Sequence, residues 1–303
     1  MKNLIVVRGG GELATGVIHR LHNAGYRVLV LEQAKPSAIR REIVFAEALY
    51  SGEKRVERVT ARRAVDLDEA KHIMKAGDVA VLVDPEAKCV RALKPKVVVD
   101  AIYAKRNLGT TRDMADLTIG IGPGFCAGRD VRCVVETMRG HNLGRLIYEG
   151  HSMLETDPAA STMPEKASQV IYAPVDGRLE NGRTLSFTVH AGENIAFICS
   201  QDNQIVEIKA PVYGVLRGLI HDGYEVRKGL KIAEIDPSTR PDNCFTISAK
   251  SRCVSGAVLE AILAWERGVR DLNIYTPGVI LHHGQGLFLC NRVRYIDFDN
   301  DYS

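Results

Sequence analysis

The sequence has little of what would mark a disulfide-bonded, metal-binding or membrane protein. Its seven cysteines are scattered, odd in number and never spaced as Cys-x-x-Cys, which argues against both a disulfide framework and a zinc ribbon. No segment approaches the roughly 20 apolar residues that a membrane helix needs. The apolar run at Leu4 to Val7 ends at Arg8 and is too short for the core of a signal peptide. These absences predict a reduced, cytoplasmic protein without a metal site.

Net charge of either sign is also nearly absent. The 303 residues hold 40 Lys and Arg against 37 Asp and Glu, a formal charge of +3. This balance predicts neither a nucleic-acid partner nor binding to an anionic membrane. The spread of Gly, Pro and aliphatic residues excludes the collagen, disordered and coiled-coil classes. What remains is a globular chain, long enough for about two domains and able to bury a sizeable core.

Strand and helix patterns alternate over the first part of the chain. An apolar run at Leu4–Val7 precedes a glycine turn, then helical spacing over 12–24, then a second run at Arg27–Leu31. This order predicts parallel strands joined by a right-handed crossover. We therefore expect an α/β fold, with a Rossmann-like parallel sheet domain over 1–150. Later patterns predict helices over 67–76 and 86–93, and strands over 79–83, 97–99, 117–121, 131–135 and 143–148.

The second part of the chain contains an internal repeat. A stretch rich in Thr, Pro, Ser and Glu predicts a linker over 151–168. Beyond it, Ala173-Pro174-Val175-Asp176-Gly177 recurs as Ala210-Pro211-Val212-Tyr213-Gly214, and each copy is followed by a second glycine turn. Two short all-β halves with matched turns predict a pseudo-symmetric β sandwich over 169–237. Helical spacing over 255–267 predicts a helix within a C-terminal segment, 238–272, and no element is assigned over 273–303.

The repeat resembles the biotinyl/lipoyl carrier fold. Domains of that group place a modified lysine at the hairpin that joins the two halves. The equivalent stretch here, Ser200 to Gln204, contains no lysine, and Lys209 lies at the start of the second copy instead. The resemblance therefore implies an unmodified β sandwich that carries neither biotin nor lipoyl.

The glycine turn near the start of the chain fits a dinucleotide fingerprint. In Gly9-x-Gly11-x-x-Ala14, the first glycine permits a tight turn, the second lets the backbone approach a pyrophosphate, and the small third residue lets helix pack on strand. Glu32, at the end of the next strand, would accept from a ribose hydroxyl. Any positive φ at Gly11 would add strain to a substitution there. The predicted ligand contacts at this turn are Gly9, Gly10, Gly11, Ala14, Thr15 and Glu32.

Two interpretations of this glycine turn stay open. Either it binds a phosphate-bearing ligand, or the glycines only make a strand–helix turn and Glu32 is a solvated strand end. Glu12 complicates the first reading, because it places a carboxylate where a phosphate would lie.

A second candidate follows the strand at 97–99. Asp100 closes that strand, and ligands of open α/β sheets bind outside the carboxyl ends of strands. Lys105 and Thr110 follow within a basic, hydroxyl-containing stretch that would suit an anionic ligand. If Asp100 faces the same crevice as the glycine turn, Asp100→Asn should impair the activity more than the fold. The alternative is a solvated loop with ordinary charges. A third glycine-dense turn, Gly120 to Gly124, predicts either a further backbone contact with the ligand or a simple tight turn.

The chain resembles the YqeB family over residues 1 to about 265. The matching motifs are Val7-Arg8-Gly9-Gly10-Gly11-Glu12-Leu13-Ala14-Thr15-Gly16, Glu32-x-x-Lys35-Pro36-x-Ala38-Ile39-Arg40-Arg41, Phe45-Ala46-Glu47-Ala48, Val99-Asp100-Ala101-Ile102-x-Ala104-Lys105, Asn107-Leu108-Gly109-Thr110-Thr111, Gly122-Pro123-Gly124-Phe125, Gly140-His141-x-Leu143-Gly144-Arg145 and Val258-Leu259-Glu260-Ala261-Ile262. Proteins of this family are proposed accessory proteins of the selenium-dependent molybdenum hydroxylase system. The stretch 273–303 is extra relative to the family pattern.

The resemblance implies a role in supplying a molybdenum enzyme with its cofactor or its labile selenium or sulfur. We therefore expect a maturation protein that binds a nucleotide-bearing ligand such as a molybdopterin dinucleotide, with an apo-molybdenum hydroxylase as partner. The alternative is an NAD(P)-dependent oxidoreductase that uses the same turn. The sequence favours the first, because no general acid or hydride-site residue stands out. Whether the chain catalyses a reaction, and whether it forms a homo-oligomer, both stay open.

Overall fold

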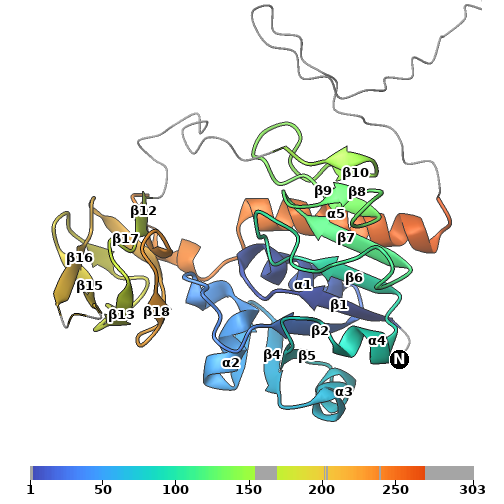
Figure 1. Ribbon diagram of the computed structural model, residues 1–303, viewed down its shortest axis with the longest axis horizontal. Helices are drawn as coiled ribbons and strands as arrows, with labels where there is room; N and C mark the ends of the chain where they lie inside the picture. Colours follow the sequence, from blue (N-terminus) through green and yellow to red (C-terminus); the bar gives the residue numbers. More distant parts are fainter. Residues whose placement is uncertain (1–2, 154–168, 201, 203, 239, 270–303) are drawn as a thin grey trace, which may run out of the picture.

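The apolar runs of the first part of the chain form one nine-stranded sheet in the computed structural model, which describes residues 3–153, 169–200, 202, 204–238 and 240–269 (Figure 1). Six neighbouring pairs are parallel, and only the two outermost pairs, β9/β10 and β3/β4, are antiparallel. The expected α/β class with a parallel-containing sheet is confirmed. The order across the sheet is β10 (Leu146–Ile147), β9 (Cys133–Val135), β7 (Leu117–Ile121), β6 (Val97–Asp100), β1 (Leu4–Arg8), β2 (Arg27–Glu32), β5 (Val79–Val83), β4 (Val59–Ala64) and β3 (Glu53–Val56). A separate small sheet pairs β8 (Cys126–Ala127) with β11 (Gly150–His151).

Helices cover both faces of this sheet. Because side chains alternate along a strand, β1 sends Ile5 and Val7 into one hydrophobic cluster and Leu4 and Val6 into another. The helices α1 (Glu12–Asn23) and α5 (Ala249–Glu266) pack on the first face. The helices α3 (Leu67–Ala76) and α4 (Cys89–Leu93) pack on the second. The strands are therefore buried on both sides, which explains their continuous apolar runs.

The C-terminal helix completes the core of the first sheet. It begins at Ala249, earlier than predicted, where the Ser248 side chain caps it by accepting from the Ser251 N–H. It runs alongside α1 so closely that a Cβ on Gly16 would lie 2.8 Å from the Ser251 Cβ. Further along, the Arg20 guanidinium donates to the Ser255 hydroxyl at 2.9 Å. Since Gly16 and Arg20 meet Ser251 and Ser255 in the same order, the two helices are parallel and begin at the same edge of the sheet.

The repeat forms two four-stranded sheets around one hydrophobic cluster, here called the β domain (169–236). Each sheet takes two strands from each copy of the repeat, so the halves are intertwined, and all of its paired strands are antiparallel. One sheet has the order β12 (Gln169–Tyr172), β19 (Lys231–Asp236), β17 (Gly214–Leu219), β14 (Thr188–Val189); the other has β16 (Ile205–Lys209), β15 (Asn194–Cys199), β13 (Gly177–Glu180), β18 (Glu225–Val226).

The repeated glycines hold equivalent places in the two halves. A Cβ on Gly177 would lie 2.4 Å from the Cys199 carbonyl oxygen, and one on Gly214 would lie 2.6 Å from the Asp236 carbonyl oxygen. Each glycine is therefore required by the close approach of the strand that ends its own half. The lysine-free stretch 200–204 joins the halves in sequence, between β15 and β16, and its residues 201 and 203 lie outside the described residues.

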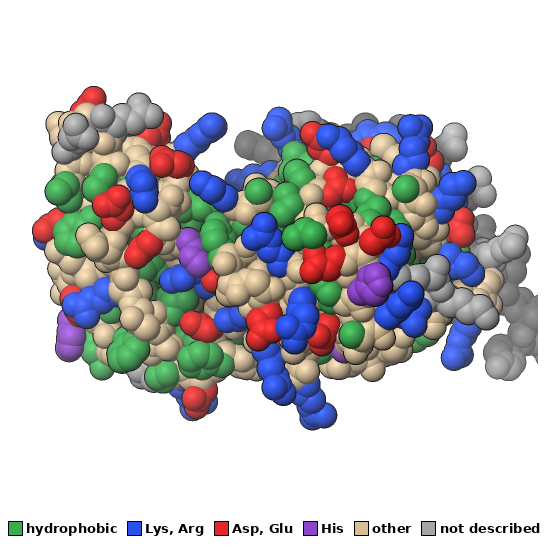
Figure 2. All heavy atoms as spheres, turned by 90° about the horizontal axis from the view of Figure 1, so that it is seen from below, with side chains coloured by type: hydrophobic (Ala, Val, Ile, Leu, Met, Phe, Trp, Pro, Cys, Tyr) green, Lys and Arg blue, Asp and Glu red, His purple; other side chains and the backbone are tan. Residues whose placement is uncertain are grey.

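A connector at 39–51 lies between the two domains, which sit side by side with a notch between them in Figure 2. It contains two short 3₁₀ helices, Arg41–Ile43 and Phe45–Glu47, and α2 (Ala48–Ser51). The Leu219 N–H donates to the Ile39 carbonyl at 2.9 Å, and the Ile39 side chain belongs to the core of the β domain. On the other side, the Ala46 N–H donates to the Gly10 carbonyl at 3.0 Å. The connector thus touches the glycine turn and the β domain at once.

Several predicted elements are shorter than their sequence patterns. The helix expected over 86–93 starts only at Cys89, because Ala87 has a φ of +55°. The strand expected over 143–148 is limited to β10, because Gly144 has a φ of +80°. A 3₁₀ turn at Pro241–Cys244 leads toward α5. Most of the predicted linker, 154–168, and the extension 273–303 lie outside the described residues. Within the described residues, no helix is both long enough and apolar enough to cross a bilayer.

Candidate functional site

Three of the predicted site segments meet where parallel strands end. Arg8, the last residue of β1, pairs in register with Leu31 on one side and with Asp100 on the other. The turn after β1, Glu32 at the end of β2 and Asp100 at the end of β6 therefore lie at one edge of the sheet, here called the carboxyl edge. This is the edge at which open α/β sheets bind ligands.

The three glycines of the turn differ in why glycine is needed at each position. Gly9 has a φ of +94°, and a Cβ there would lie 2.9 Å from the Ile102 Cα. A Cβ on Gly10 would lie 2.9 Å from the Ala46 backbone nitrogen. Gly11 is the N-cap of α1 with a φ of −71°, and a Cβ there would meet nothing within 4 Å. The strained backbone is therefore at Gly9 rather than at Gly11, and Gly11 faces open space.

Glu32 is tied to the turn rather than solvated at a strand end. Its carboxylate accepts from the Gly10 N–H at 2.8 Å and from the Gln33 N–H at 2.8 Å. Burial raises the pKa of Glu32, although these two hydrogen bonds favour the charged form. A half-buried carboxylate beside a helix N-terminus can accept from a ribose hydroxyl and would repel a phosphate attached to that ribose position.

The Glu12 carboxylate is engaged away from the turn. Arg40 of the connector donates to Glu12 at 2.6 Å and to Glu234 of the β domain at 2.7 Å. Arg217 and Lys231 also pair with Glu234. Burial raises the pKa of Glu12, and the nearby Glu234 carboxylate raises it further. Because Arg40 neutralises it, Glu12 contributes to the contact between the domains instead of opposing an anion at Gly11.

Ala14 and Thr15 hold the turn in place from below. Both are fully buried. The Thr15 hydroxyl donates to the Gly10 carbonyl at 3.2 Å and accepts from the Phe45 N–H at 3.0 Å. The Thr15 hydroxyl therefore links the glycine turn to the connector and is not free to contact a ligand.

Asp100 and Thr110 form a buried network with Arg8. The Arg8 guanidinium lies 3.3 Å from the Asp100 carboxylate and 2.5 Å from the Thr110 hydroxyl, which donates to Asp100 at 2.6 Å. Arg8 and Asp100 are each 1% exposed. Burial raises the pKa of Asp100, against the opposing effects of Thr110 and Arg8. Lys105, in contrast, is exposed, and none of the described contacts joins it to the turn.

Two further residues at this edge were not among the predicted ligand contacts, although Tyr103 lies in the predicted stretch that follows Asp100. Tyr103 has a φ of +62°, a strained conformation for a residue other than glycine, and its ring lies against Gly122. Lys250, in the first turn of α5, has its Nζ 3.2 Å from the Tyr103 hydroxyl and 5.3 Å from the centre of the ring. The third glycine turn therefore belongs to the same edge. A Tyr beside the predicted Asp100 could have been suspected from its position, but no local signal connects Lys250 to this edge.

The carboxyl edge offers positive charge and hydrogen-bond donors to an anion. The N-termini of α1 and α5 point to the same edge, and Lys250 adds a positive charge. No group of three or more metal-ligating side chains occurs among the described residues. Two shallow depressions of the surface are lined by other residues: 87, 88, 90, 91, 94, 95, 111–116, 129 and 132.

Comparison with solved structures adds no argument about function. The product-bound ectoine utilization protein EutE (DoeB) of Ruegeria pomeroyi is 12% identical, with 76% of this chain and 56% of that chain covered and a TM-score of 0.22. A putative succinylglutamate desuccinylase/aspartoacylase family protein of Shewanella amazonensis is 10% identical, with 77% of this chain and 90% of that chain covered and a TM-score of 0.25. Both scores are too low to relate the folds. No family model matches the chain.

Sequence comparison gives a much stronger match. The chain is 44% identical over 260 residues to the Escherichia coli (strain K12) protein named "Uncharacterized protein YqeB", with 86% of this chain and 47% of that protein covered. The chain thus spans about half the length of the curated relative that it matches. The aligned length agrees with the extent over which the motifs resemble that family. The chain belongs to the YqeB family.

Proposed function

We propose that this chain binds a nucleotide-bearing ligand at the carboxyl edge and acts as an accessory protein in the maturation of selenium-dependent molybdenum hydroxylases. The observation that carries the binding proposal is Gly11. It is an N-cap whose side-chain position is open, and no side chain caps the helix there. The first N–H groups of α1 need acceptors, and a phosphate is the natural one.

The strand order supports a Rossmann-like domain. Numbered by their order along the chain, the strands β1, β2, β5, β6, β7 and β9 stand as 3-2-1-4-5-6 across the sheet, the arrangement of dinucleotide-binding folds. In such sheets the ligand lies where the order reverses, which here is between β1 and β6. Glu32 at the end of β2 suits a ribose hydroxyl. We propose Gly9, Gly10, Gly11 and Glu32 as ligand contacts, with Tyr103 and Lys250 on the other side of the turn.

The remaining predicted residues take a supporting role in this proposal. Ala14 and Thr15 shape the turn, while Asp100 and Thr110 anchor Arg8 beneath it. Lys105 is exposed to solvent, and only a ligand that extends beyond the turn would contact it.

The β domain has the intertwined halves expected of an unmodified biotinyl/lipoyl-like fold. We propose that it acts through the connector, which joins it to Gly10, and that it takes no covalent cofactor, since the turn at 200–204 has no lysine. An intact-mass measurement that showed one added biotin or lipoyl group would contradict this.

The maturation role rests on the family resemblance. Its expected ligand is a molybdopterin dinucleotide, and its expected partner is an apo-molybdenum hydroxylase. One observation favours a second candidate, an NAD-dependent oxidoreductase: the Tyr103 hydroxyl lies 3.2 Å from the Lys250 Nζ beside the turn, and such a pair can move a proton.

The identity of the ligand distinguishes the two functions. Mass spectrometry of the purified protein, together with thermal shifts in NAD, NADP and pterin dinucleotides, would show which ligand binds. A shift with a pterin dinucleotide alone, and loss of molybdenum hydroxylase activity in a deletion strain, support the maturation role. Turnover of a small substrate with NAD, or normal hydroxylase activity in the deletion strain, would contradict it.

A further inference from the structure

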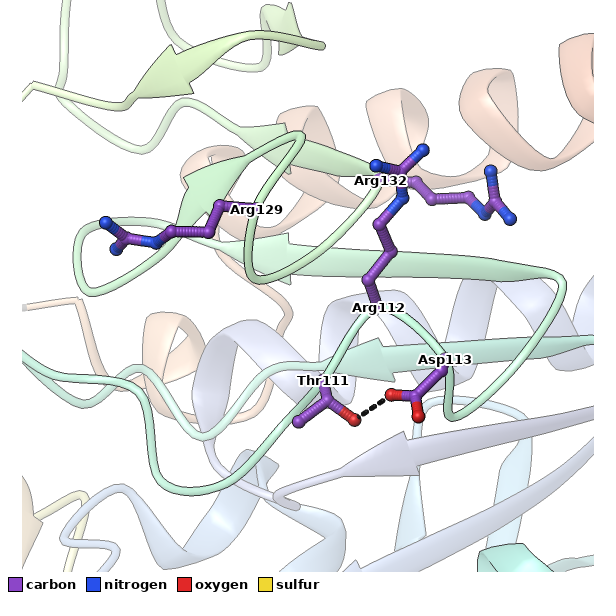
Figure 3. Close-up of a pocket in the computed structure, with 5 residues that line it drawn as sticks. All are labelled: Thr111, Arg112, Asp113, Arg129 and Arg132. Atoms are coloured by element: carbon purple, nitrogen blue, oxygen red, sulfur yellow. Dashed lines mark hydrogen bonds between the residues drawn. The ribbon is translucent and has the colours of Figure 1, made fainter.

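A shallow basic groove lies on the α3/α4 face of the large sheet, away from the carboxyl edge. It joins two depressions, of about 410 and 890 Å³, that share Thr111, Arg112, Asp113 and Arg132. The larger one continues along α4 to Pro95. Figure 3 shows Arg112 extending toward Arg132 from a different segment, while Arg129 points away from both.

The groove concentrates positive charge. The larger depression is lined by five Lys and Arg residues and two Asp residues, a surplus of +3 that equals the formal charge of the whole chain. The basic residues are exposed and come from three separate segments: Lys88, Arg91 and Lys94 around α4, Arg112 in the segment before β7, and Arg132 before β9.

Most of this charge is not neutralised by neighbours. Lys88 pairs with Glu86 at 2.8 Å, and Arg129, at the rim, pairs with Asp130 at 2.9 Å. Asp113 accepts from the Thr111 hydroxyl. Across the part of the chain that the structure describes, no ion pair is formed by Arg91, Lys94, Arg112 or Arg132. Arg112 donates only to the Gly128 carbonyl, at 2.8 Å.

The form of the groove suits a macromolecule better than a small phosphate. Phosphate sites usually supply backbone N–H groups from a helix N-terminus or a nest. Both ends of α4 line this groove, but the N–H groups of Lys88 and Cys89 at its N-terminus already donate to the Asp84 carboxylate, at 3.0 and 2.8 Å. Met114, which is half-buried, adds apolar surface between the charged side chains. Flexible cations around such a surface can match the carboxylates of a polypeptide and attract it over a distance.

We propose that the basic groove docks an acidic segment of a partner protein, through carboxylate contacts with Arg112 and Arg132 and through apolar contact with Met114. The groove is separate from the glycine turn, so this docking stands whether or not a nucleotide binds at the carboxyl edge.

Fluorescence anisotropy with the full chain tests the proposal. The probe is a fluorescein-labelled peptide of alternating Glu and Leu residues. We expect saturable binding that weakens with added salt, because exposed charges are screened. The double variant Arg112→Glu/Arg132→Glu should lose affinity by about tenfold or more. A matched control, Arg27→Glu/Arg58→Glu, changes the net charge equally at two exposed positions outside the groove and should bind like the wild type.

Each other outcome overturns the proposal. Wild-type protein that does not bind the peptide at low salt would show that no acidic segment docks. Equal losses in both double variants would show that net charge, and not the groove, is responsible. Saturable binding of inorganic tripolyphosphate without binding of the peptide would assign the groove to a small phosphate ligand. Circular dichroism and thermal midpoints verify that both double variants are folded.

Discussion

The Arg8 and Asp100 side chains at the carboxyl edge are buried and paired, whereas most charged side chains of the basic groove are exposed and form no described ion pair. At the edge, Arg8 and Asp100 are each 1% exposed and are joined to each other and to Thr110. In the groove, Arg112 and Arg132 are exposed and have no described ion pair. A buried charge needs a partner because it has lost its water, whereas an exposed charge does not. Substitutions that remove a buried charge at the edge should therefore change stability, and substitutions that remove an exposed charge in the groove should change only binding.

The largest expected difference is between Asp100→Asn and Arg112→Met. Removal of the Asp100 charge leaves Arg8 buried without its anion, which should lower the free energy of unfolding by about 3–5 kcal/mol. Arg112→Met should stay within about 0.5 kcal/mol of the wild type. Urea denaturation measures both. A loss for Asp100→Asn no larger than that for Arg112→Met would show that Arg8 does not need the Asp100 charge.

Within the turn, Gly9→Ala should be more harmful than Gly11→Ala. An alanine at residue 9 meets a φ of +94° and a backbone atom at 2.9 Å, whereas at residue 11 it meets neither. We expect Gly9→Ala to cost about 2 kcal/mol or more and Gly11→Ala to be nearly neutral. Thermal unfolding of the two variants under the same conditions compares them. Equal costs would show that the turn does not have this geometry.

Arg40→Met should weaken the contact between the domains. It removes charge-assisted hydrogen bonds to Glu12 and Glu234, while Glu234 keeps Arg217 and Lys231 as partners. The expected loss of stability is about 1–3 kcal/mol. Limited proteolysis should cut the variant faster near the connector. Unchanged stability and cleavage would mean that Arg40 is not holding the two domains together.

The smallest expected effect is a dependence on pH. Since burial raises the pKa of Glu32, its stabilising contribution is fully present below the pKa of the unfolded chain and is lost as pH rises through the folded value. Glu32→Gln does not titrate. The wild-type advantage in unfolding free energy over Glu32→Gln should therefore shrink as pH rises above the pKa of an unfolded glutamate, about 4.3. An advantage that grew with pH would indicate a lowered pKa instead.

The sequence predicted what depends on neighbours along the chain. The runs at Val79–Val83 and Leu117–Ile121 and the helix at Leu67–Ala76 have the predicted bounds, because apolar periodicity and turn residues are local signals. The convergence of Gly9, Glu32 and Asp100 at one edge followed from the parallel order of their strands.

The rest depends on contacts between distant residues. Arg8 and Asp100 are 92 positions apart, and Tyr103 and Lys250 are 147 apart. Neither pair has a spacing that periodicity could reveal. The connector also lacks a regular pattern, because its 3₁₀ turns are fixed by the two domains on either side of it. The groove is assembled from three segments, so its charge is invisible in a balanced composition.

Calorimetric titration of Gly11→Val tests the central claim most directly, with the pterin dinucleotide or NAD that shifts the wild type as the titrant. A Cβ on Gly11 has open space and φ is −71°, so this variant should fold. Gly256→Val is the matched control, since its Cβ has only Arg20 nearby, at 3.8 Å. The account predicts that Gly11→Val abolishes binding while Gly256→Val retains it. A folded Gly11→Val protein with unchanged affinity would contradict it and leave the glycines as a turn alone.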